Sequence, residues 1–273
     1  MTAAGLRLEN LVNQPQSWDF SGAEQLYAGV DLGTYKAIAI IIDETGKPRA
    51  VRMQRAEVVR SGLIIDYAGA QQIVRDMLAE LRTASPLPFE RGATSFPPKT
   101  EYANIDATRY ILEGAGLEVL NVLDEPSAAN QILKLTSGAI VDVGGGTTGI
   151  AVIKDGNIVF SDDEATGGVH LSLVVAGNYK IDYEAAEKLK TDPHRNAEII
   201  AVVKPVIEKI ASIVNDSLRP FTDLSDVCLV GGTCELKGFA KIVQDVLQIN
   251  TFRPEKPQFV TPLGIALSCL EAG

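Results

Sequence analysis

The sequence predicts an α/β protein built from two similar lobes that face each other across a cleft. Its 273 residues suffice for one large domain or two medium ones, and 46% of them are hydrophobic, enough to form buried cores. Short apolar segments of strand length alternate with segments of helical periodicity. One pattern occurs twice: an apolar strand ending in aspartate, a glycine turn with threonine, a second strand, a hairpin and a third strand. The repetition predicts an internal duplication.

The first copy of this pattern begins at residue 27. An apolar strand ends at Asp31, a turn follows at 32–34, and Asp43 opens a hairpin turn between two further strands. Downstream, apolar residues at helical spacing predict the first helices. The elements predicted for this half are strands at 27–31, 37–42, 48–53, 93–98 and 118–123, helices at 67–82 and 101–115, and a further helix that residues 124–129 open.

The second copy begins at residue 139. Its first strand also carries an aspartate, Asp142, and leads into a run of three glycines. Pro205 falls within a long helical pattern, so we expect it to bend or split that helix. The elements predicted for this half are strands at 139–143, 149–153, 158–161 and 226–230, and helices at 168–177, 183–190, 196–218, 235–247 and 261–271.

These elements divide the chain into three expected parts. Residues 1–26 form a polar leader, residues 27–138 with 260–273 form the first lobe, and residues 139–259 form the second lobe. Apolar residues of the leader line one side of a short helix that Pro15 stops. We interpret the leader as a loosely attached arm; the alternative is a helix that docks on a partner.

Charge and composition exclude several classes of function. The formal net charge is −10 and the sequence pI is about 4.8, which argues against binding to nucleic acid or to anionic lipid. The three cysteines are scattered and the two histidines lie far apart, which excludes a disulfide scaffold and a structural zinc site and suggests that the cysteines fill the core. No apolar run approaches the roughly 20 residues of a membrane span, and no secretory signal is visible. We therefore expect a soluble, cytoplasmic protein.

The duplicated turns carry the chemistry of a phosphate site. Glycine lets backbone N–H groups approach the oxygens of a polyphosphate, and two opposed turns hold it from both sides. Two aspartates, one from each lobe, hold the waters of a magnesium ion, and a glutamate polarises an attacking water. A third glycine turn packs on a nucleoside. The candidates are Asp31 and Asp142 for the metal, Glu125 and Asp142 for catalysis, and Gly33, Thr34, Gly144, Gly145, Gly146, Thr147, Gly168, Gly231 and Gly232 for the ligand.

Each of these features also has a plain structural interpretation. A lone glycine turn is usually only a turn, and an aspartate at a strand end is often a cap. His170 is expected to be a side chain at a helix start, and Lys99 a solvated lysine of a loop. The case for a binding site rests on the paired occurrence of aspartate, glycine and threonine.

Five segments in order resemble those of the actin/DnaK-type chaperone/sugar-kinase superfamily, whose lobes are ribonuclease H-like. The motifs are specific, and the resemblance covers roughly residues 27–270. Within the superfamily the chain is most similar to the EutJ family of chaperone-like proteins of ethanolamine utilisation. The segments are 29–34 and 141–147 as phosphate loops, 124–129 and 261–266 as connecting helices, and 229–233 as the adenosine motif.

The resemblance implies ATP with Mg²⁺ between the lobes. It also implies a role in assembling or reactivating client proteins, with ethanolamine ammonia lyase or components of a bacterial microcompartment as candidate clients and the microcompartment as a candidate location. The alternative is a nucleotide-dependent assembly scaffold like FtsA and PilM, without significant catalysis. A sugar or acetate kinase is a third option.

The chain departs from DnaK-type chaperones in ways that bear on catalysis. The short first lobe has no recognisable counterpart of the stretch that holds their catalytic lysine. Tyr35 stands where they have a second threonine, Gly149 where they have an aspartate, and Glu235 where an arginine usually reaches the base. These departures suggest a weak ATPase at most.

Overall fold

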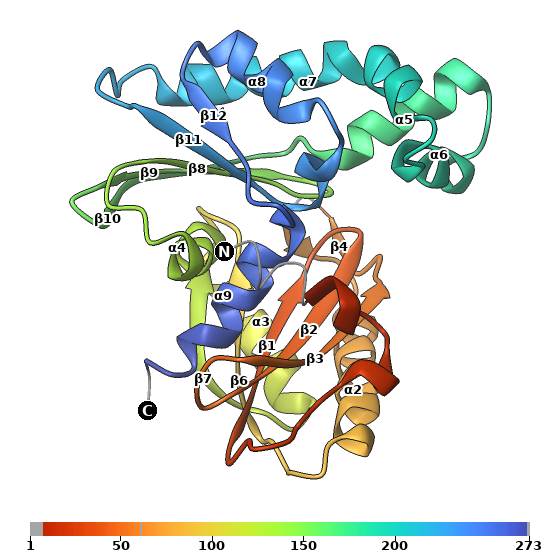
Figure 1. Cartoon of the computed structure of the whole chain (residues 1–273), viewed down its shortest axis with the longest axis vertical. Coiled ribbons are helices and arrows are strands. Elements are labelled where there is room, and N and C mark those ends of the chain that lie inside the picture. Colours follow the sequence, from red (N-terminus) through yellow and green to blue (C-terminus); the bar gives the residue numbers. More distant parts are fainter. Residues whose placement is uncertain (1–7, 61, 272–273) are drawn as a thin grey trace.

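Two five-stranded sheets with the same strand order organise the molecule (Figure 1). The computed structural model describes residues 8–60 and 62–271. The first sheet has the order β3-β2-β1-β6-β7 and the second the order β10-β9-β8-β11-β12. The strands are β1 (Leu26–Leu32), β2 (Lys36–Asp43), β3 (Pro48–Arg55), β6 (Arg91–Phe96) and β7 (Glu118–Asp124), then β8 (Gly138–Val143), β9 (Thr148–Lys154), β10 (Asn157–Glu164), β11 (Asp226–Val230) and β12 (Asn250–Phe252).

The pairing confirms the predicted duplication. In each sheet the first three strands along the chain pair antiparallel, and the two later strands add in parallel on the other side of the first strand. In both sheets the strand that ends beside the glycine turn is therefore central, buried by neighbours on both sides. The α/β two-lobe fold expected from the sequence is confirmed.

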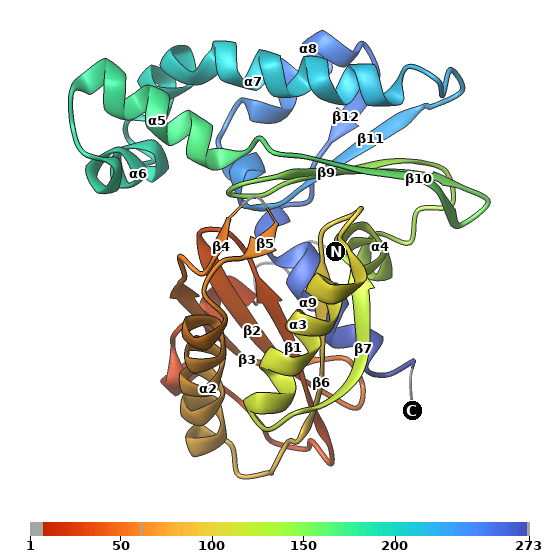
Figure 2. The same ribbon diagram turned by 180° about the vertical axis from the view of Figure 1, so that it is seen from behind.

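Helices cover the outer face of each sheet and also fill the space between the sheets (Figures 1 and 2). On the first sheet the outer helices are α2 (Tyr67–Ala84) and α3 (Tyr102–Gly114). On the second they are α5 (Gly168–Tyr179), α7 (Asn196–Leu218) and α8 (Phe239–Leu247), with α6 (Tyr183–Thr191) against α5 and α7. Two connecting helices, α4 (Glu125–Leu133) and α9 (Val260–Ser268), lie between the sheets.

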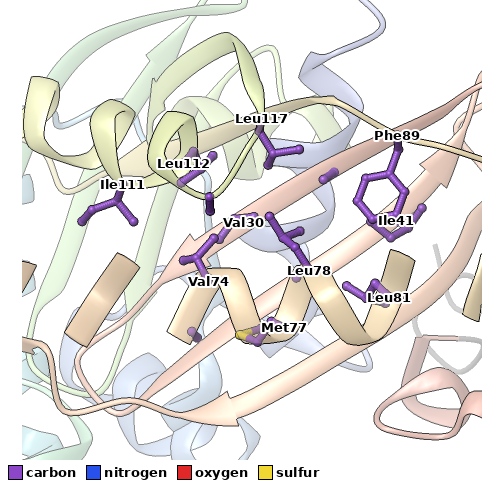
Figure 3. Close-up of a cluster of buried hydrophobic side chains, with 14 of the residues drawn as sticks. Val30, Ile41, Val74, Met77, Leu78, Leu81, Phe89, Ile111, Leu112 and Leu117 are labelled. Atoms are coloured by element: carbon purple, nitrogen blue, oxygen red, sulfur yellow. The ribbon is translucent and has the colours of Figure 1, made fainter. Parts of the chain in front are cut away.

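The core of the first lobe shows why these segments take these forms (Figure 3). Helix α2 begins where Asp66 accepts a hydrogen bond from the Gly69 N–H, which satisfies one of the free amides of the first turn. Its apolar residues recur at helical spacing and meet the side chains of β1, β2 and α3 in a cluster shielded from water. The cluster includes Val30, Ile41, Val74, Met77, Leu78, Leu81, Phe89, Ile111, Leu112 and Leu117.

The connecting helices α4 and α9 pack so closely against each other, and α9 against β1, that only glycine fits at two of the contacts. A Cβ atom at Gly264 of α9 would overlap the carbonyl oxygen of Ala128 in α4, and one at Gly29 of β1 would overlap the backbone of Ala266. Glycine is therefore required at both contacts. This packing fixes the first residues of α4 and α9 beside the ends of β1 and β8.

The N-terminal segment is packed on the first lobe, so the expectation of a loosely attached arm is wrong for residues 8–26. Leu8 and Leu11 are buried against α9 and the inner face of the first sheet. The Trp18 indole N–H donates to the Leu11 carbonyl at 2.7 Å, and Arg49 donates to the Asp19 carbonyl at 3.0 Å. Leu8 and Leu11, which suggested a helix that docks on a partner, thus pack against this chain's own first lobe. Leu6 lies outside the described residues.

Several element boundaries differ from the prediction. Pro205 does not split α7, which runs unbroken from residue 196 to residue 218. The helix expected from residue 235 begins only at Phe239, because η2 (Gly232–Glu235) comes first and Gly238 is left-handed at φ +101°. Short elements were missed: β4 (Val59–Arg60), β5 (Leu63–Ile64), β12, η1 (Pro15–Ser17) and η3 (Pro257–Phe259). Among the described residues, no helix has the length and apolar character needed to cross a bilayer.

Candidate functional site

A cleft of about 510 Å³ opens between the two lobes. Its walls come from both glycine turns, the first residues of α4 and α9, the α5–α6 pair and η2. The structure brings together on these walls every candidate site residue of the sequence: Asp31, Gly33, Thr34, Glu125, Asp142, Gly144, Gly145, Gly146, Thr147, Gly168, Gly231 and Gly232.

The two phosphate-loop candidates have the same local geometry. The Gly33 N–H donates to the Lys36 carbonyl at 3.1 Å, and the Gly144 N–H donates to the Thr147 carbonyl at 3.0 Å. Each turn thus closes a hairpin between the first two strands of its sheet. The turns touch across the cleft, because a Cβ at Gly146 would lie 2.5 Å from Thr34 Oγ1. The two turns are therefore similar in structure and line the same cleft from opposite lobes.

The second turn is braced from behind. Its Gly144 and Gly145 carbonyls accept the Gly168 and Val169 N–H groups of α5 at 3.0 and 2.8 Å. The Thr233 hydroxyl donates to the Gly144 carbonyl at 2.7 Å. The Gly168 N–H is therefore committed to the turn, so Gly168 shapes the cleft through its position and its lack of a side chain. A Cβ there would lie 2.6 Å from Thr233 Oγ1.

Three carboxyl groups, those of Asp31, Glu125 and Asp142, line one end of the cleft, and the Asp163 carboxyl lies next to them. Asp31 lies near the end of β1, Asp142 near the end of β8 and Asp163 in β10, and Glu125 is the first residue of α4 after the Asp124 N-cap. Asp142 Oδ2 accepts a 2.6 Å hydrogen bond from the Thr261 hydroxyl. Asp163 Oδ1 is buried without a hydrogen-bond partner among the described residues.

This arrangement raises the pKa of each of these groups. Burial, reinforced by the Asp142 charge, raises the pKa of Asp31 to about 7. Burial also raises the pKa of Asp163 to about 7, although a hydrogen bond from Thr147 opposes it. The pKa values of Glu125 and Asp142 are raised, chiefly by burial. A bound cation would therefore stabilise the charged form of these carboxyl groups.

The donor set fits a hydrated magnesium ion. Carboxylate oxygens are its preferred protein ligands, and it keeps several waters. Among the described residues no three carboxylate, histidine or cysteine side chains converge closely enough to hold a metal directly. The orphaned oxygen of Asp163 and the spacing of the carboxylates therefore suit an ion bound through water and phosphate oxygens.

Lysine 36 is a cleft residue that the sequence analysis missed. It begins β2 directly after Tyr35, and its ammonium group donates to Gln258 Oε1. Burial lowers the pKa of Lys36, while Glu235 and Asp31 oppose this shift. The sequence did contain a signal for this role, because Lys36 is a charged residue directly before the apolar run of residues 37–42. Lys36 supplies a positive charge to the cleft from the start of β2, directly after the first glycine turn.

A second polar network lies on the wall formed by α5 and α6. Lys190 Nζ lies 2.6 Å from Glu187 Oε1, 2.8 Å from Ser172 Oγ and 3.2 Å from the Gly168 carbonyl oxygen. Burial lowers the pKa of Lys190, and Glu187 opposes the shift. Glu187 and Lys190 line the same cleft as the glycine turns.

Ion pairs join the lobes on either side of the cleft. Arg55 at the end of β3 pairs with Glu184 of α6 at 2.5 Å and lies over the Tyr35 ring. Lys99, expected to be solvated, pairs with Asp162 of β10 at 2.5 Å although its own side chain is 62% exposed.

Two plain structural predictions are also supported. The Gly167 N–H donates to His170 Nδ1 at 3.3 Å at the start of α5, so His170 is a helix-start side chain. All three cysteines are buried in the cores.

Comparisons with known proteins agree with this architecture. The family model of the type IV pilus assembly protein PilM matches residues 101–256. The ethanolamine utilization protein EutJ of Escherichia coli strain K12 is 44% identical over 246 residues, which are 89% of this chain and 86% of that protein. The crystal structure of EutJ from Carboxydothermus hydrogenoformans has a TM-score of 0.90 at 42% identity and covers 97% of this chain and 98% of that one.

A more distant likeness concerns the fold alone. MreB5 of Spiroplasma citri, in a crystal structure bound to ADP, has a TM-score of 0.71 at 17% identity and covers 88% of this chain and 95% of that one. Identity and coverage together show that the chain belongs to the EutJ family, with the two-lobe fold of the actin-like ATPases.

Proposed function

We propose that the chain binds ATP with Mg²⁺ in the cleft between its lobes. The observation that carries this proposal is the pair of mirrored glycine turns beside carboxylates from both lobes. The amides near Gly33 and Gly145 hold the phosphates, and Lys36 adds a positive charge. Asp31 and Asp142 hold the hydrated ion, and Glu125 orients a water. When bound, Mg²⁺ neutralises phosphate charge. ADP in the similar MreB5 structure supports the nucleotide assignment.

Hydrolysis in this site is slow. Phosphoryl transfer depends on positioned charge around the terminal phosphate. Tyr35 and Gly149 stand where DnaK-type chaperones have a threonine and an aspartate, so the hydroxyl and the carboxylate that those chaperones place at these positions are missing here. We therefore propose that nucleotide acts mainly through the relative position of the lobes, with weak ATPase activity at most.

The biological role proposed is chaperone-like assistance to ethanolamine utilisation. Membership of the EutJ family supports it. The clients would be proteins such as ethanolamine ammonia lyase or components of a microcompartment in the cytoplasm. The test is recovery of inactivated ethanolamine ammonia lyase with and without the chain and ATP. Recovery that is unaffected by the chain would remove this client from consideration.

Titration calorimetry tests the nucleotide proposal. ATP and ADP are titrated into wild type with and without Mg²⁺, and then into the Asp142→Ala variant. Wild type should bind both nucleotides, and Asp142→Ala should lose most of the Mg²⁺ dependence. The matched control Asp223→Ala removes an exposed aspartate that pairs with Lys154 in the second lobe. The proposal fails when neither nucleotide binds wild type at about millimolar concentration, a free energy of about −4 kcal/mol.

A second candidate is an assembly scaffold that uses nucleotide without significant catalysis. The match of residues 101–256 to the PilM family model favours it. Sedimentation and electron microscopy with ATP distinguish the two candidates. Filaments or large assemblies of the chain alone would support the scaffold, whereas a species of constant size that still binds ATP would support the chaperone-like role.

A further inference from the structure

The loop after β6 forms the wall at the carboxylate end of the cleft. Pro97 lines the cleft, and Pro98 lies 3.6 Å from the position that a Cβ of Gly149 would take. Glu125 Oε2 is 3.9 Å from that same position, so the loop adjoins Glu125. The Thr100 hydroxyl donates to the Pro97 carbonyl at 2.6 Å, which holds the loop in a compact turn.

Lys99 lies at the tip of this loop in an unusual backbone conformation. Its φ of +58° falls in the left-handed region, which costs a non-glycine residue conformational energy. This geometry accompanies the ion pair of Lys99 Nζ with Asp162 Oδ1 in the other lobe. The loop thus reaches across the cleft from the first lobe to strand β10 of the second.

The receiving carboxylate is already oriented. Asp162 Oδ1 also accepts the Asp163 N–H at 2.8 Å, and its side chain is only 15% exposed. The next residue along β10 is Asp163. Lys99 therefore binds the strand segment that carries Asp163, next to the carboxylates that line the cleft, at the end where the phosphates and the cation would lie.

We propose that the Lys99–Asp162 ion pair is a gate at the carboxylate end of the cleft that slows the exit of a bound nucleoside diphosphate and its cation. This inference rests on the proposed nucleotide binding. The lobes cannot separate at this end while the pair is formed, because Lys99 belongs to one lobe and Asp162 to the other. The pair is accessible to solvent on the Lys99 side, so it opens and closes easily and responds to salt.

Dissociation of a fluorescent ADP analogue, chased with excess ADP in a stopped-flow instrument, tests the gate. The Lys99→Asn variant removes the charge with a residue that tolerates the left-handed conformation. Asp162→Asn removes the partner charge and keeps an oxygen for the Asp163 N–H. Each variant should release the analogue about two- to fivefold faster than wild type, the range that an exposed ion pair supports.

Coupling between the two residues distinguishes a gate from two independent effects. The double variant should release the analogue no faster than either single variant. Raising salt from about 0.05 M to about 1 M should speed release from wild type and leave the variants nearly unchanged. The control Lys241→Gln breaks an exposed pair with Asp245 inside one lobe and should match wild type.

Two results would overturn the gate. Equal release rates for wild type, Lys99→Asn and Asp162→Asn would do so, and so would rate increases that multiply in the double variant. Wild type that binds no analogue at all would instead refute the nucleotide proposal and the gate with it. Because two variants on different lobes are used, misfolding of one, seen in its melting curve, leaves the other to decide.

Discussion

Thr261 and Asp142 connect the two halves of the site. The Thr261 hydroxyl, in the first turn of α9, donates a 2.6 Å hydrogen bond to Asp142 Oδ2 in β8, and both side chains are buried. The bond favours the charged form of Asp142 and so opposes the rise in the pKa of Asp142 that burial causes. The second connecting helix therefore helps to set the charge of the second lobe's aspartate.

Replacing Thr261 with valine should weaken the binding of Mg²⁺ and nucleotide. Valine keeps the shape but leaves a buried carboxylate oxygen without its donor, which costs about 1–3 kcal/mol. We expect about tenfold weaker binding of MgADP by calorimetry and a lower melting temperature. Thr261→Ser retains the hydroxyl and should bind nearly as wild type does. Equal binding by the valine variant would show that Asp142 is oriented without Thr261.

The stability of the ligand-free protein should fall as the pH rises toward neutrality. Asp163 and Asp31 have pKa values of about 7 in the folded protein against 3.8 for a free aspartate. Between these values the folded state binds more protons than the unfolded state. The stabilisation is complete below the unfolded pKa and is lost as the pH rises through the folded pKa.

The Asp163→Asn variant isolates one of these groups. At about pH 8 it should be more stable than wild type by about 2 kcal/mol, because no charge is then buried at that position. Its unfolding free energy should also decline less between about pH 5 and pH 8. Thermal melts across this range measure both effects. The control Asp223→Asn changes an exposed group, whose pKa is lowered by Lys154, and should leave the slope in this range unchanged.

Replacing glycine with alanine should have opposite effects at two positions, one at the crossing of α4 and α9 and the other in α5. Gly264→Ala places a methyl group onto the Ala128 carbonyl oxygen, so it should destabilise the fold by about 3 kcal/mol or more. Gly177→Ala in α5 meets nothing within 4 Å and should stabilise it by about 0.5–1 kcal/mol. Urea titrations measure both changes. A stable Gly264→Ala protein would show that the connecting helices can separate without cost.

The sequence predicted the elements whose residues repeat or are strongly periodic. The helix at 196–218 and the strand at 226–230 have the bounds predicted, and the duplicated turns meet as expected. The wrong helix start at residue 235 follows from Gly238, whose left-handed conformation separates η2 from α8. Strands of two or three residues, such as β5, carry too little pattern to be read.

The missed site residues depend on contacts distant in the chain. Asp163 belongs to an acidic run that looks like a solvated strand end until β10 pairs with β9 and places it opposite Gly149. Thr261 acquires its role from Asp142, 119 residues away. Leu8 and Leu11 formed a visible apolar face, but only tertiary structure shows that α9 covers it. Local pattern cannot supply such pairings.

The contact between the two glycine turns gives a test of the phosphate-binding proposal that does not touch the carboxylates. A Cβ at Gly146 would lie 2.5 Å from Thr34 Oγ1, so Gly146→Ala should push the turns apart. Backbone amides displaced by even a fraction of an ångström make poorer hydrogen bonds with phosphate oxygens. We expect ADP binding without Mg²⁺ to weaken about tenfold, with little loss of stability because the turns are at the surface of the cleft.

Removing the obstructing side chain should reverse this effect. In the Gly146→Ala/Thr34→Gly double variant the methyl group gains space, so binding should recover toward the level of Thr34→Gly alone. Gly156→Ala is a control, although its φ of +77° carries a small cost in the hairpin after β9, because nothing lies within 4 Å of its Cβ position. Undiminished ADP binding by Gly146→Ala would mean that the second turn does not hold the phosphates. Loss of binding in that variant without recovery in the double variant would place the effect in the backbone of residue 146 rather than in the contact between the turns.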